Sequence, residues 1–215
     1  MRIAREGRPL IAIGFLVLLV LVAVAVGSNN PVSYMALGLW APVAIWIPVF
    51  FRDPHRDGQR GDELIIAPAD GVVVSVADIE EDEYLHGPAK RVSIFMNALN
   101  VHVNRHPITG VVEHRRYRPG RFFNASLDKA SIHNERMSLG VRGKYGPILV
   151  RQIAGLIARR IVADPLPNST VRQGERLGII KFGSRVDVFI PRTGEPTVDV
   201  GTKTRAGITV IGRWK

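Results

Sequence analysis

The stretch that decides the fold is "LGIIKFGSRVDVFIP", residues 177–191. Two runs rich in isoleucine, valine and phenylalanine stand on either side of the dipeptide Gly183-Ser184. Alternating apolar and polar side chains after Ser184 are typical of a β-strand. Neither an Asn-Gly nor an Asp-Gly of the usual tight hairpin separates the two runs. The stretch therefore predicts two strands. The glycine and the small hydroxyl residue between them need an explanation.

Similar short runs, separated by glycine and proline, fill the chain from residue 64 onward. Examples are "GVVVSVADI" at 71–79, "RVSIFM" at 91–96 and "GPILVRQIAG" at 146–155. Period-two alternation with frequent turn signals predicts a mainly β, single barrel-like or sandwich-like domain over residues 64–215, with few helices. The best candidate for an extra helix lies around residues 153–160.

The first fifty residues have a different character. Residues 10–26 and 32–51 contain no charged side chain, and each run approaches or reaches the ~20 residues that cross a bilayer as a helix. A cleaved signal peptide is the alternative for the first run, but a second apolar run follows directly. We therefore predict a membrane-associated helical hairpin over residues 1–51. Pro42 and Pro48 leave a re-entrant hairpin open beside a spanning one.

Positive charge flanks this hairpin on both sides and dominates the rest of the chain. The flanking arginines are Arg2, Arg5, Arg8, Arg52, Arg56 and Arg60. Positive flanks predict that both ends lie in the cytoplasm, which places the C-terminal domain on the cytoplasmic face of the cell (inner) membrane. The polar residues 52–63 read as a linker. The whole chain carries a net charge of +10, and this basic excess beside a membrane segment fits an anionic lipid surface rather than nucleic acid.

Two histidines stand four residues apart in "NVHVNRHP". On an extended strand His102 and His106 share a face and can point into one site. A metal ion would need a third ligand, for which Asp70, His133 and Glu135 are the candidates. No metal-site signature accompanies them, so we expect no metal. The chain has no cysteine, which excludes thiol chemistry and disulfides.

The Gly183-Ser184 dipeptide does not match the usual serine-nucleophile motifs. A nucleophile elbow needs a helix after the serine, and a strand is predicted here instead. Lys181 lies three residues away, on the opposite face of a strand. Another chemistry requires glycine directly before serine: the hydroxyl attacks the preceding carbonyl, and glycine permits the strained approach. Elimination from the resulting ester cuts the chain and leaves dehydroalanine, which hydrolyses to a pyruvoyl group.

Five motifs in order extend this reading over residues 50–191. They are "FFRDPHR", "APADGVV", "IFMNALNVHVNRHP", "HNERM" and "GERLGIIKFGSRVDVFIP". With these motifs the chain resembles the phosphatidylserine decarboxylase proenzymes of the short bacterial and archaeal type. The resemblance covers nearly the whole predicted soluble domain, and the last motif, which holds the cut site, is the most specific.

The resemblance implies an enzyme that decarboxylates phosphatidylserine to phosphatidylethanolamine in phospholipid biosynthesis. It implies autocatalytic cleavage between Gly183 and Ser184, with Ser184 becoming the pyruvoyl group that forms a Schiff base with the substrate amine. The products would be a β chain, residues 1–183, and an α chain, residues 184–215. The two chains would form a heterodimer that acts on membrane phospholipid, and assembly into a higher oligomer is left open.

The resemblance also assigns roles around the serine. Asp70 matches the carboxylate that, with a histidine, activates the serine. His102 matches the first of two family histidines, whereas Arg105 occupies the place of the second, with His106 beside it. Either His102 or His106 could therefore activate Ser184, and the other could protonate the product.

An anionic headgroup needs cationic contacts, and we expect Arg105, Arg136 and Arg185 to supply them. Two alternatives from other classes remain: a membrane-anchored β module that binds anionic lipid, and a membrane-tethered serine peptidase. A peptidase would keep an intact serine in a full-length chain, whereas pyruvoyl formation demands a cut chain.

Overall fold

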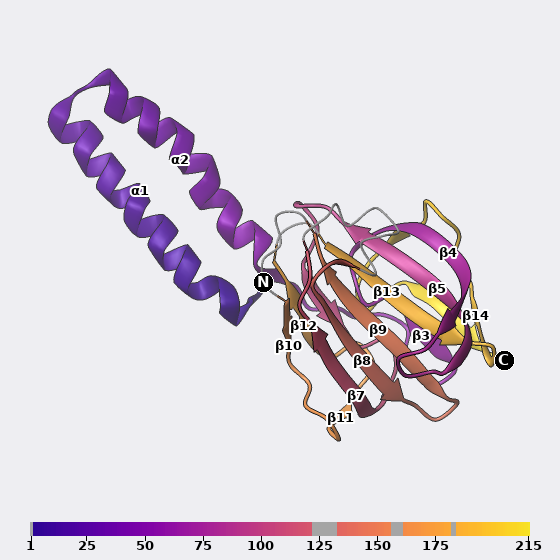
Figure 1. Ribbon diagram of the computed structural model, residues 1–215. Helices are drawn as coiled ribbons and strands as arrows, with labels where there is room; N and C mark the ends of the chain where they lie inside the picture. The colour runs from indigo at the N-terminus through magenta and orange to yellow at the C-terminus, as the bar shows by residue number, and fades with distance from the viewer. Residues whose placement is uncertain (1, 122–132, 156–160, 182–183) are drawn as a thin grey trace. The chain divides into compact units, whose positions relative to one another are not determined.

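The computed structural model describes residues 2–121, 133–155, 161–181 and 184–215 (Figure 1). The chain forms two compact units, Met1–His55 and Arg56–Lys215. Gly183, on one side of the predicted cut, lies outside the described residues.

The N-terminal unit is a helical hairpin. Helix α1 spans Arg8–Ser28 and α2 spans Pro31–Phe50, and the two lie side by side (Figure 1). Asn29 ends α1 in a left-handed conformation with φ 46°. The side chain of Asn30 caps α2 by accepting a hydrogen bond from the Val32 N–H at 2.9 Å. Two asparagines therefore make the tight turn between two apolar helices.

Short elements close the base of the hairpin unit. A 3₁₀ turn, η1 Arg5–Gly7, precedes α1, and β1 Arg2–Ile3 pairs antiparallel with β2 Arg52–Asp53. The ring of Phe51 packs so closely on Gly7 that an added Cβ there would lie 2.3 Å from it.

The surface of the hairpin is largely apolar. Leu19 and Leu39 are 66% and 71% exposed, and the Trp40 indole N–H donates to the Gly14 carbonyl at 3.0 Å between the helices. By length and composition both helices are apolar enough to cross a membrane. The predicted hairpin is confirmed as structure, and its apolar surface is suited to membrane association.

The C-terminal unit is built on an eight-stranded antiparallel sheet of order β11-β7-β8-β9-β13-β5-β4-β15. The strands, in that order, are Thr170–Val171, Gly110–Arg118, Arg136–Arg142, Pro147–Ala154, Ser184–Pro191, Gly87–Met96, Gly71–Glu81 and Lys203–Thr204. The sheet curls around a core of buried aliphatic side chains from many of its strands (Figure 1). The prediction of a mainly β domain is confirmed.

Two three-stranded sheets accompany the large one. One has the order β10-β12-β6, from Ile161–Ala163, Arg176–Ile180 and Val103–Arg105; the other has the order β14-β16-β3, from Gly194–Pro196, Val210–Trp214 and Leu64–Ile66. Leu177 and Ile180 of β12 and Ile211 of β16 join the same core as the large sheet. The three sheets therefore share one hydrophobic interior.

Strand β13 has two chemically different faces. Val186, Val188 and Ile190 belong to the core, so their side of the large sheet is here called the inner face. Arg185 and Asp187 alternate with them and lie on the other side, here called the outer face. The position of Ser184 in the alternation places its side chain on the inner face.

The structure also explains why no hairpin turn separates residues 177–180 from 184–191. Strand β12 belongs to the β10-β12-β6 sheet, whereas β13 lies in the middle of the large sheet between β9 and β5. The chain changes sheets between them, so Ser184 begins a strand instead of lying within one.

The extra helix predicted around residues 153–160 is wrong at its start. Ile153 and Ala154 end strand β9, where they pair with β8 and β13. Pairing on both sides outweighs the local helical pattern. Residues 156–160 lie outside the described residues.

The predicted linker, residues 52–63, is not uniformly detached. Its second half contacts the C-terminal unit: the Arg60 guanidinium donates to the Gly207 carbonyl at 2.8 Å, and the Gly61 N–H donates to Gln173 Oε1 at 3.1 Å. Arg56 also pairs with Asp70. Residues 56–63 are thus held by long-range hydrogen bonds, and the domain limits we propose shift accordingly toward residue 56.

Candidate active site

Ser184 is the first residue of β13 and is fully buried. It pairs with Met96 of β5 on one side and Ala154 of β9 on the other. Its hydroxyl donates to the Met96 sulfur, with 3.4 Å between Oγ and Sδ. A thioether is a weak acceptor, so this contact positions the hydroxyl without engaging its lone pairs.

A short chain of neutral polar groups continues from Met96 into the interior. The Asn104 amide nitrogen lies 3.7 Å from Met96 Sδ, and Gln152 Nε2 donates to Asn104 Oδ1 at 2.8 Å. All three side chains are buried. Gln152 Oε1 has no hydrogen-bond partner within the described part of the chain. Uncharged amide groups therefore reach the Met96 sulfur that the Ser184 hydroxyl contacts.

The "HNERM" motif lies against the strand next to Ser184. The Asn134 amide donates to the Ala154 carbonyl at 2.7 Å, and the Ala154 N–H donates to the Glu135 carbonyl at 2.9 Å. Since Ala154 is the direct neighbour of Ser184, these bonds fix the backbone of β9 beside the predicted cut.

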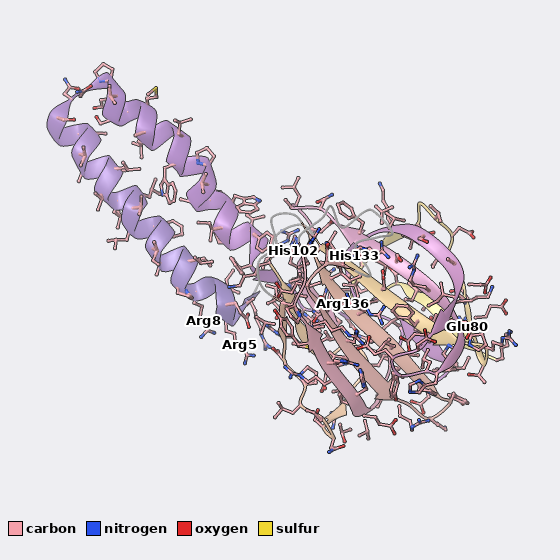
Figure 2. All side chains as sticks on the ribbon, in the orientation of Figure 1. Arg5, Arg8, Glu80, His102, His133 and Arg136 are labelled. Carbon is pink, nitrogen blue, oxygen red and sulfur yellow. The ribbon has the colours of Figure 1, made fainter. Side chains whose placement is uncertain are left out.

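The two predicted histidines flank strand β6, one at each end. His102 is fully buried, and its Nδ1 lies 3.0 Å from the Asn100 carbonyl (Figure 2). Because a carbonyl oxygen only accepts, Nδ1 donates this hydrogen bond, and Nε2 is the nitrogen that holds the lone pair whenever the ring is neutral. His102 thus has the tautomer of a general base at Nε2.

His106 has a drier environment. Its side chain is 1% exposed, and neither ring nitrogen has a hydrogen-bond partner among the described residues. Burial lowers the pKa of His106 to about 4, so the ring is neutral at pH 7. It lines a cavity of about 330 Å³ together with Asp164 and Arg176. The spacing prediction of one shared site for both histidines is not tested by these contacts.

Asp70 lies in the turn before β4, and both of its oxygens are engaged. Arg56 Nη2 lies 2.7 Å from Oδ2, and the Ala206 N–H donates to Oδ1 at 2.7 Å. The same turn touches β6, because the Arg105 N–H donates to the Pro68 carbonyl at 2.9 Å. The fold therefore brings the Asp70 turn to strand β6, which His102 and His106 flank, although thirty residues or more separate them in the sequence.

The three predicted headgroup arginines lie in different places. Arg105 is on β6 near Gly207, where an added Cβ would lie 3.5 Å from the Arg105 side chain. Arg185 is fully buried and forms a two-point ion pair with Asp187, Nε to Oδ1 at 2.6 Å and Nη2 to Oδ2 at 3.0 Å. Arg136 pairs with Ile153, which pairs with Arg185. Arg136 and Arg185 therefore occupy the outer face, whereas Ser184 faces inward.

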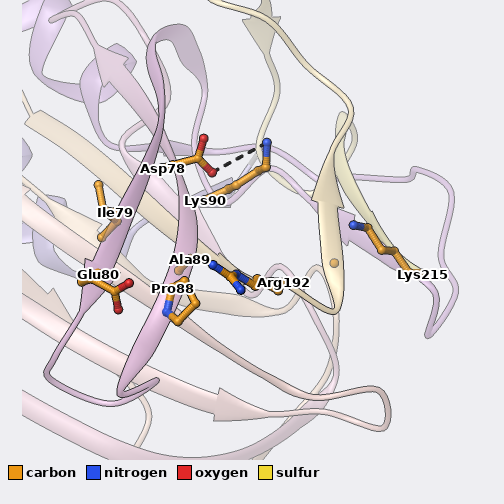
Figure 3. Close-up of a pocket in the computed structure, with 9 residues that line it drawn as sticks. Asp78, Ile79, Glu80, Pro88, Ala89, Lys90, Arg192 and Lys215 are labelled. Carbon is orange, nitrogen blue, oxygen red and sulfur yellow. Dashed lines mark ion pairs between the residues drawn. The ribbon is translucent and has the colours of Figure 1, made fainter.

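Another cavity, of about 500 Å³, lies between the β4–β5 hairpin and the C-terminal strands. Asp78, Lys90, Arg192 and Lys215 line it, and none of the predicted site residues is among its described lining (Figure 3). Its size alone does not make it the active site.

Asn104, Gln152 and Asn134 were missed as site residues by sequence reasoning. Asn104 could have been found from the sequence, because its spacing places it on the same strand face as His102 and His106. Gln152 carried a weaker one, as a polar residue on the inward-facing positions of "ILVRQIA". The bond between Asn104 and Gln152 joins residues 48 apart, and no local pattern announces it.

Comparisons with known proteins identify the family of this chain. The family model for phosphatidylserine decarboxylase matches residues 43–212. A phosphatidylserine decarboxylase proenzyme of Magnetococcus marinus is 44% identical over 214 residues, covering 99% of this chain and 95% of the relative. One of Azorhizobium caulinodans is 45% identical over 212 residues, covering 97% and 88%.

The fold, the matched residues and the relatives define the class as a decarboxylase made as a proenzyme. The chain belongs to the phosphatidylserine decarboxylase family.

Proposed function

We propose that the chain cuts itself between Gly183 and Ser184 and then decarboxylates phosphatidylserine to phosphatidylethanolamine, a step of phospholipid biosynthesis. The observation that carries this proposal is the place of Ser184. It is fully buried, it begins β13 where the chain enters the large sheet, and its hydroxyl contacts only a weak acceptor among the described residues.

The cut needs no external reagent except water. Ser184 Oγ attacks the Gly183 carbonyl carbon, the peptide C–N bond breaks, and the serine nitrogen takes up a proton, which leaves an ester. Removal of the Ser184 Cα proton then breaks the Cβ–Oγ bond and releases Gly183 as a carboxylate. The dehydroalanine left at residue 184 takes up water and loses ammonia, which gives the pyruvoyl group.

His102 is the histidine we propose as base for Ser184. Its Nδ1 contact to the Asn100 carbonyl leaves Nε2 with a lone pair, as the proton transfer requires. His106 is a weaker base, because burial lowers its pKa to about 4. We therefore assign maturation to His102, with Asp70 as the maturation carboxylate. Arg56 and the Ala206 N–H engage both carboxylate oxygens of Asp70, which supports a positioning role for Asp70.

The surroundings of Ser184 suit a pyruvoyl group, which is uncharged and presents two carbonyl oxygens. Asn104 offers amide N–H groups, Gln152 holds the Asn104 oxygen, and Met96 fills the remaining contact. A pyruvoyl ketone supplies an electron sink for the carbon that loses carbon dioxide. The chain's own residues keep water out of this interior and hold the neutral donors in place.

Among the headgroup arginines, Arg105 is the one we propose for the substrate phosphate. It lies on the histidine strand and beside the Asp70 turn. Arg136 and Arg185 stay predicted headgroup contacts, but their outer-face positions do not favour that role.

The α chain, residues 184–215, would stay bound after the cut. It contributes β13 to the middle of the large sheet, β15 to its edge, and β14 and β16 to a separate sheet with β3. These pairings tie it to the β chain through two sheets, which supports a stable heterodimer. The apolar hairpin would hold the enzyme at the inner membrane, with the arginine flanks favouring the cytoplasmic side.

A denaturing gel with mass spectrometry tests the cut. Wild type should give fragments 1–183 and 184–215, the smaller one with a blocked N-terminus, and Ser184→Ala should leave one chain. Ser93→Ala is the matched control, because Ser93 is also a fully buried strand serine but lies on the outer face. An intact, fully active wild-type chain would exclude the proposal.

A further inference from the structure

The outer face of the large sheet carries a cavity of about 650 Å³ whose described lining includes one of the predicted headgroup arginines, Arg136. We call it the arginine cavity. It is lined by Ile79, Glu80, Glu81, Asp82, Glu83, His86, Arg91, Arg116, Arg118, Arg136, Arg151 and Phe189. Its described lining contains none of Ser184, Asp70, His102 and His106. It therefore lies apart from the proposed active site, on the other side of the sheet.

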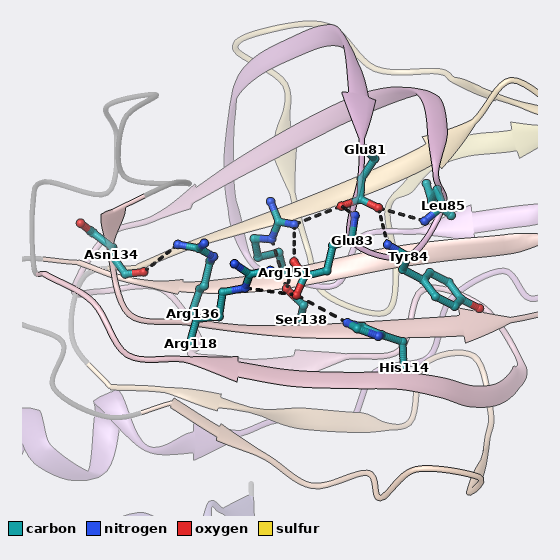
Figure 4. Close-up of polar contacts among 10 residues, drawn as sticks. All are labelled: Glu81, Glu83, Tyr84, Leu85, His114, Arg118, Asn134, Arg136, Ser138 and Arg151. Carbon is teal, nitrogen blue, oxygen red and sulfur yellow. Dashed lines mark hydrogen bonds and ion pairs between the residues drawn. The ribbon is translucent and has the colours of Figure 1, made fainter.

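The tip of the β4–β5 hairpin bounds this cavity and is firmly held. Glu81 accepts hydrogen bonds from the backbone N–H groups of Glu83, Tyr84 and Leu85, at 3.1, 2.8 and 2.9 Å (Figure 4). The Tyr84 ring covers Gly140, where an added Cβ would lie 2.6 Å from it. The cavity wall is thus preorganised, which lowers the cost of binding a ligand.

The described lining of the cavity holds one more arginine than carboxylates. Five arginines line the cavity, and two of the four carboxylates, Glu80 and Asp82, are exposed at its rim. Glu83 is shared: its Oε2 lies 2.8 Å from Arg151, and its Oε1 lies 3.5 Å from Arg118 (Figure 4). The carboxylate of Glu83 therefore lies close to more than one arginine and cannot neutralise them all.

The arginines also crowd one another. Burial, followed by the charges of Arg151 and Arg118, lowers the pKa of Arg136 below its ordinary value. Burial would raise the pKa of Glu83, but Arg151, Ser138 and Arg118 lower it overall, so Glu83 is already ionised. An added anion near Arg136 would relieve the remaining repulsion.

We propose that the arginine cavity is a second anion site that binds a phosphate group, separate from the site at Ser184. Guanidinium groups match phosphate oxygens in two-point geometry, and several of them converge here. The cavity volume lies within the range typical of small-ligand sites, ~300–1,000 Å³. The phosphate could belong to a free anion or to a phospholipid headgroup, and both present the same oxygens.

Titration calorimetry of the full chain in detergent with inorganic phosphate tests the site. Arg116→Ala should weaken phosphate binding about tenfold or more, because a charge-assisted contact is lost. Arg115→Ala is the matched control: it removes the same charge from the next position of β7, on the other face, and should change the affinity less than about twofold. Arg136→Lys, which keeps charge but loses the planar fork, should also weaken binding.

Vesicles distinguish the two sources of phosphate. With phosphatidylglycerol in phosphatidylcholine vesicles, a lipid-headgroup site predicts weaker binding of Arg116→Ala than of Arg115→Ala and release by inorganic phosphate. A free-phosphate site predicts equal vesicle binding of the two variants. Either result is consistent with a phosphate-binding site in the arginine cavity.

Two results would overturn it: no heat of binding at millimolar phosphate with wild type, or equal losses from Arg116→Ala and Arg115→Ala. Neither result depends on self-cleavage, which the gel reports separately. Failure of this site and failure of the proposed function are therefore distinguishable.

Discussion

The two faces of strand β13 place opposite chemistry within one residue of each other. On the inner face, Ser184 contacts a thioether and leads to a pair of buried amides. On the outer face, Arg185 and Asp187 form a fully buried ion pair. Side chains of successive strand residues point apart, so a sheet can separate an uncharged reaction site from an ionic network by its own thickness. The predictions below test this separation, beginning with the largest effect.

The largest effect is expected at the proposed maturation residues. Asp70→Ala and His102→Ala should both leave the chain uncut, because the serine loses its activating groups. The assay is a gel for cleavage beside carbon dioxide release from labelled phosphatidylserine. His55→Ala, an exposed histidine, is the control and should behave like wild type.

A different outcome would reassign the histidines. If His106 is the base, His102→Ala should cut itself but decarboxylate ~10²–10⁴ times more slowly, because the product lacks its proton donor. Normal cleavage and turnover in Asp70→Ala and in both single histidine variants would show that the proposed site is in the wrong place.

Breaking the outer-face ion pair between Arg185 and Asp187 should lower the free energy of unfolding. Asp187→Ala leaves the Arg185 charge buried without its two-point partner, and breaking a buried pair in this way costs ~3–5 kcal/mol. Denaturant unfolding of the uncut Ser184→Ala chain measures it. The double variant Arg185→Met, Asp187→Leu should recover much of the loss. A single variant as stable as its parent would show that the pair is not desolvated as described.

His106 should make stability depend on pH. Its folded-state pKa of about 4 is below the ~6.5 of an unfolded histidine, so between these values only the unfolded chain takes up the proton. The stability present above pH ~6.5 is therefore lost as the pH falls toward 4, by up to ~3 kcal/mol. His106→Gln should flatten this slope in unfolding experiments, whereas His55→Gln should keep it. Equal slopes would contradict the burial of a neutral ring.

The smallest effect is expected at an exposed pair. Lys90 Nζ lies 3.8 Å from Asp78 Oδ1, with the two side chains 44% and 85% exposed (Figure 3). Solvent screens such a pair, so Asp78→Asn should change the unfolding free energy by less than ~1 kcal/mol. If Asp78→Asn lost as much unfolding free energy as Asp187→Ala, the exposed and the buried ion pair would contribute equally to stability, and the expected difference between them would be wrong.

The sequence by itself determined the elements whose signals are local. Uncharged runs of bilayer length predict α1 and α2, and alternation after Ser184 predicts β13 and the face to which each side chain points. The ordered motifs also indicated the family, which the matched residues 43–212 confirm. These features depend on neighbours within a few residues, and the printed sequence contains them completely.

Only the tertiary structure decided which distant groups meet. It placed β12 and β13 in different sheets, joined Arg56 and the Ala206 N–H to Asp70, and paired Gln152 with Asn104. It also bound Arg185 to Asp187, where sequence reasoning had expected a headgroup contact. Strand order and register arise from the packing of all strands into one interior, so no single segment specifies them.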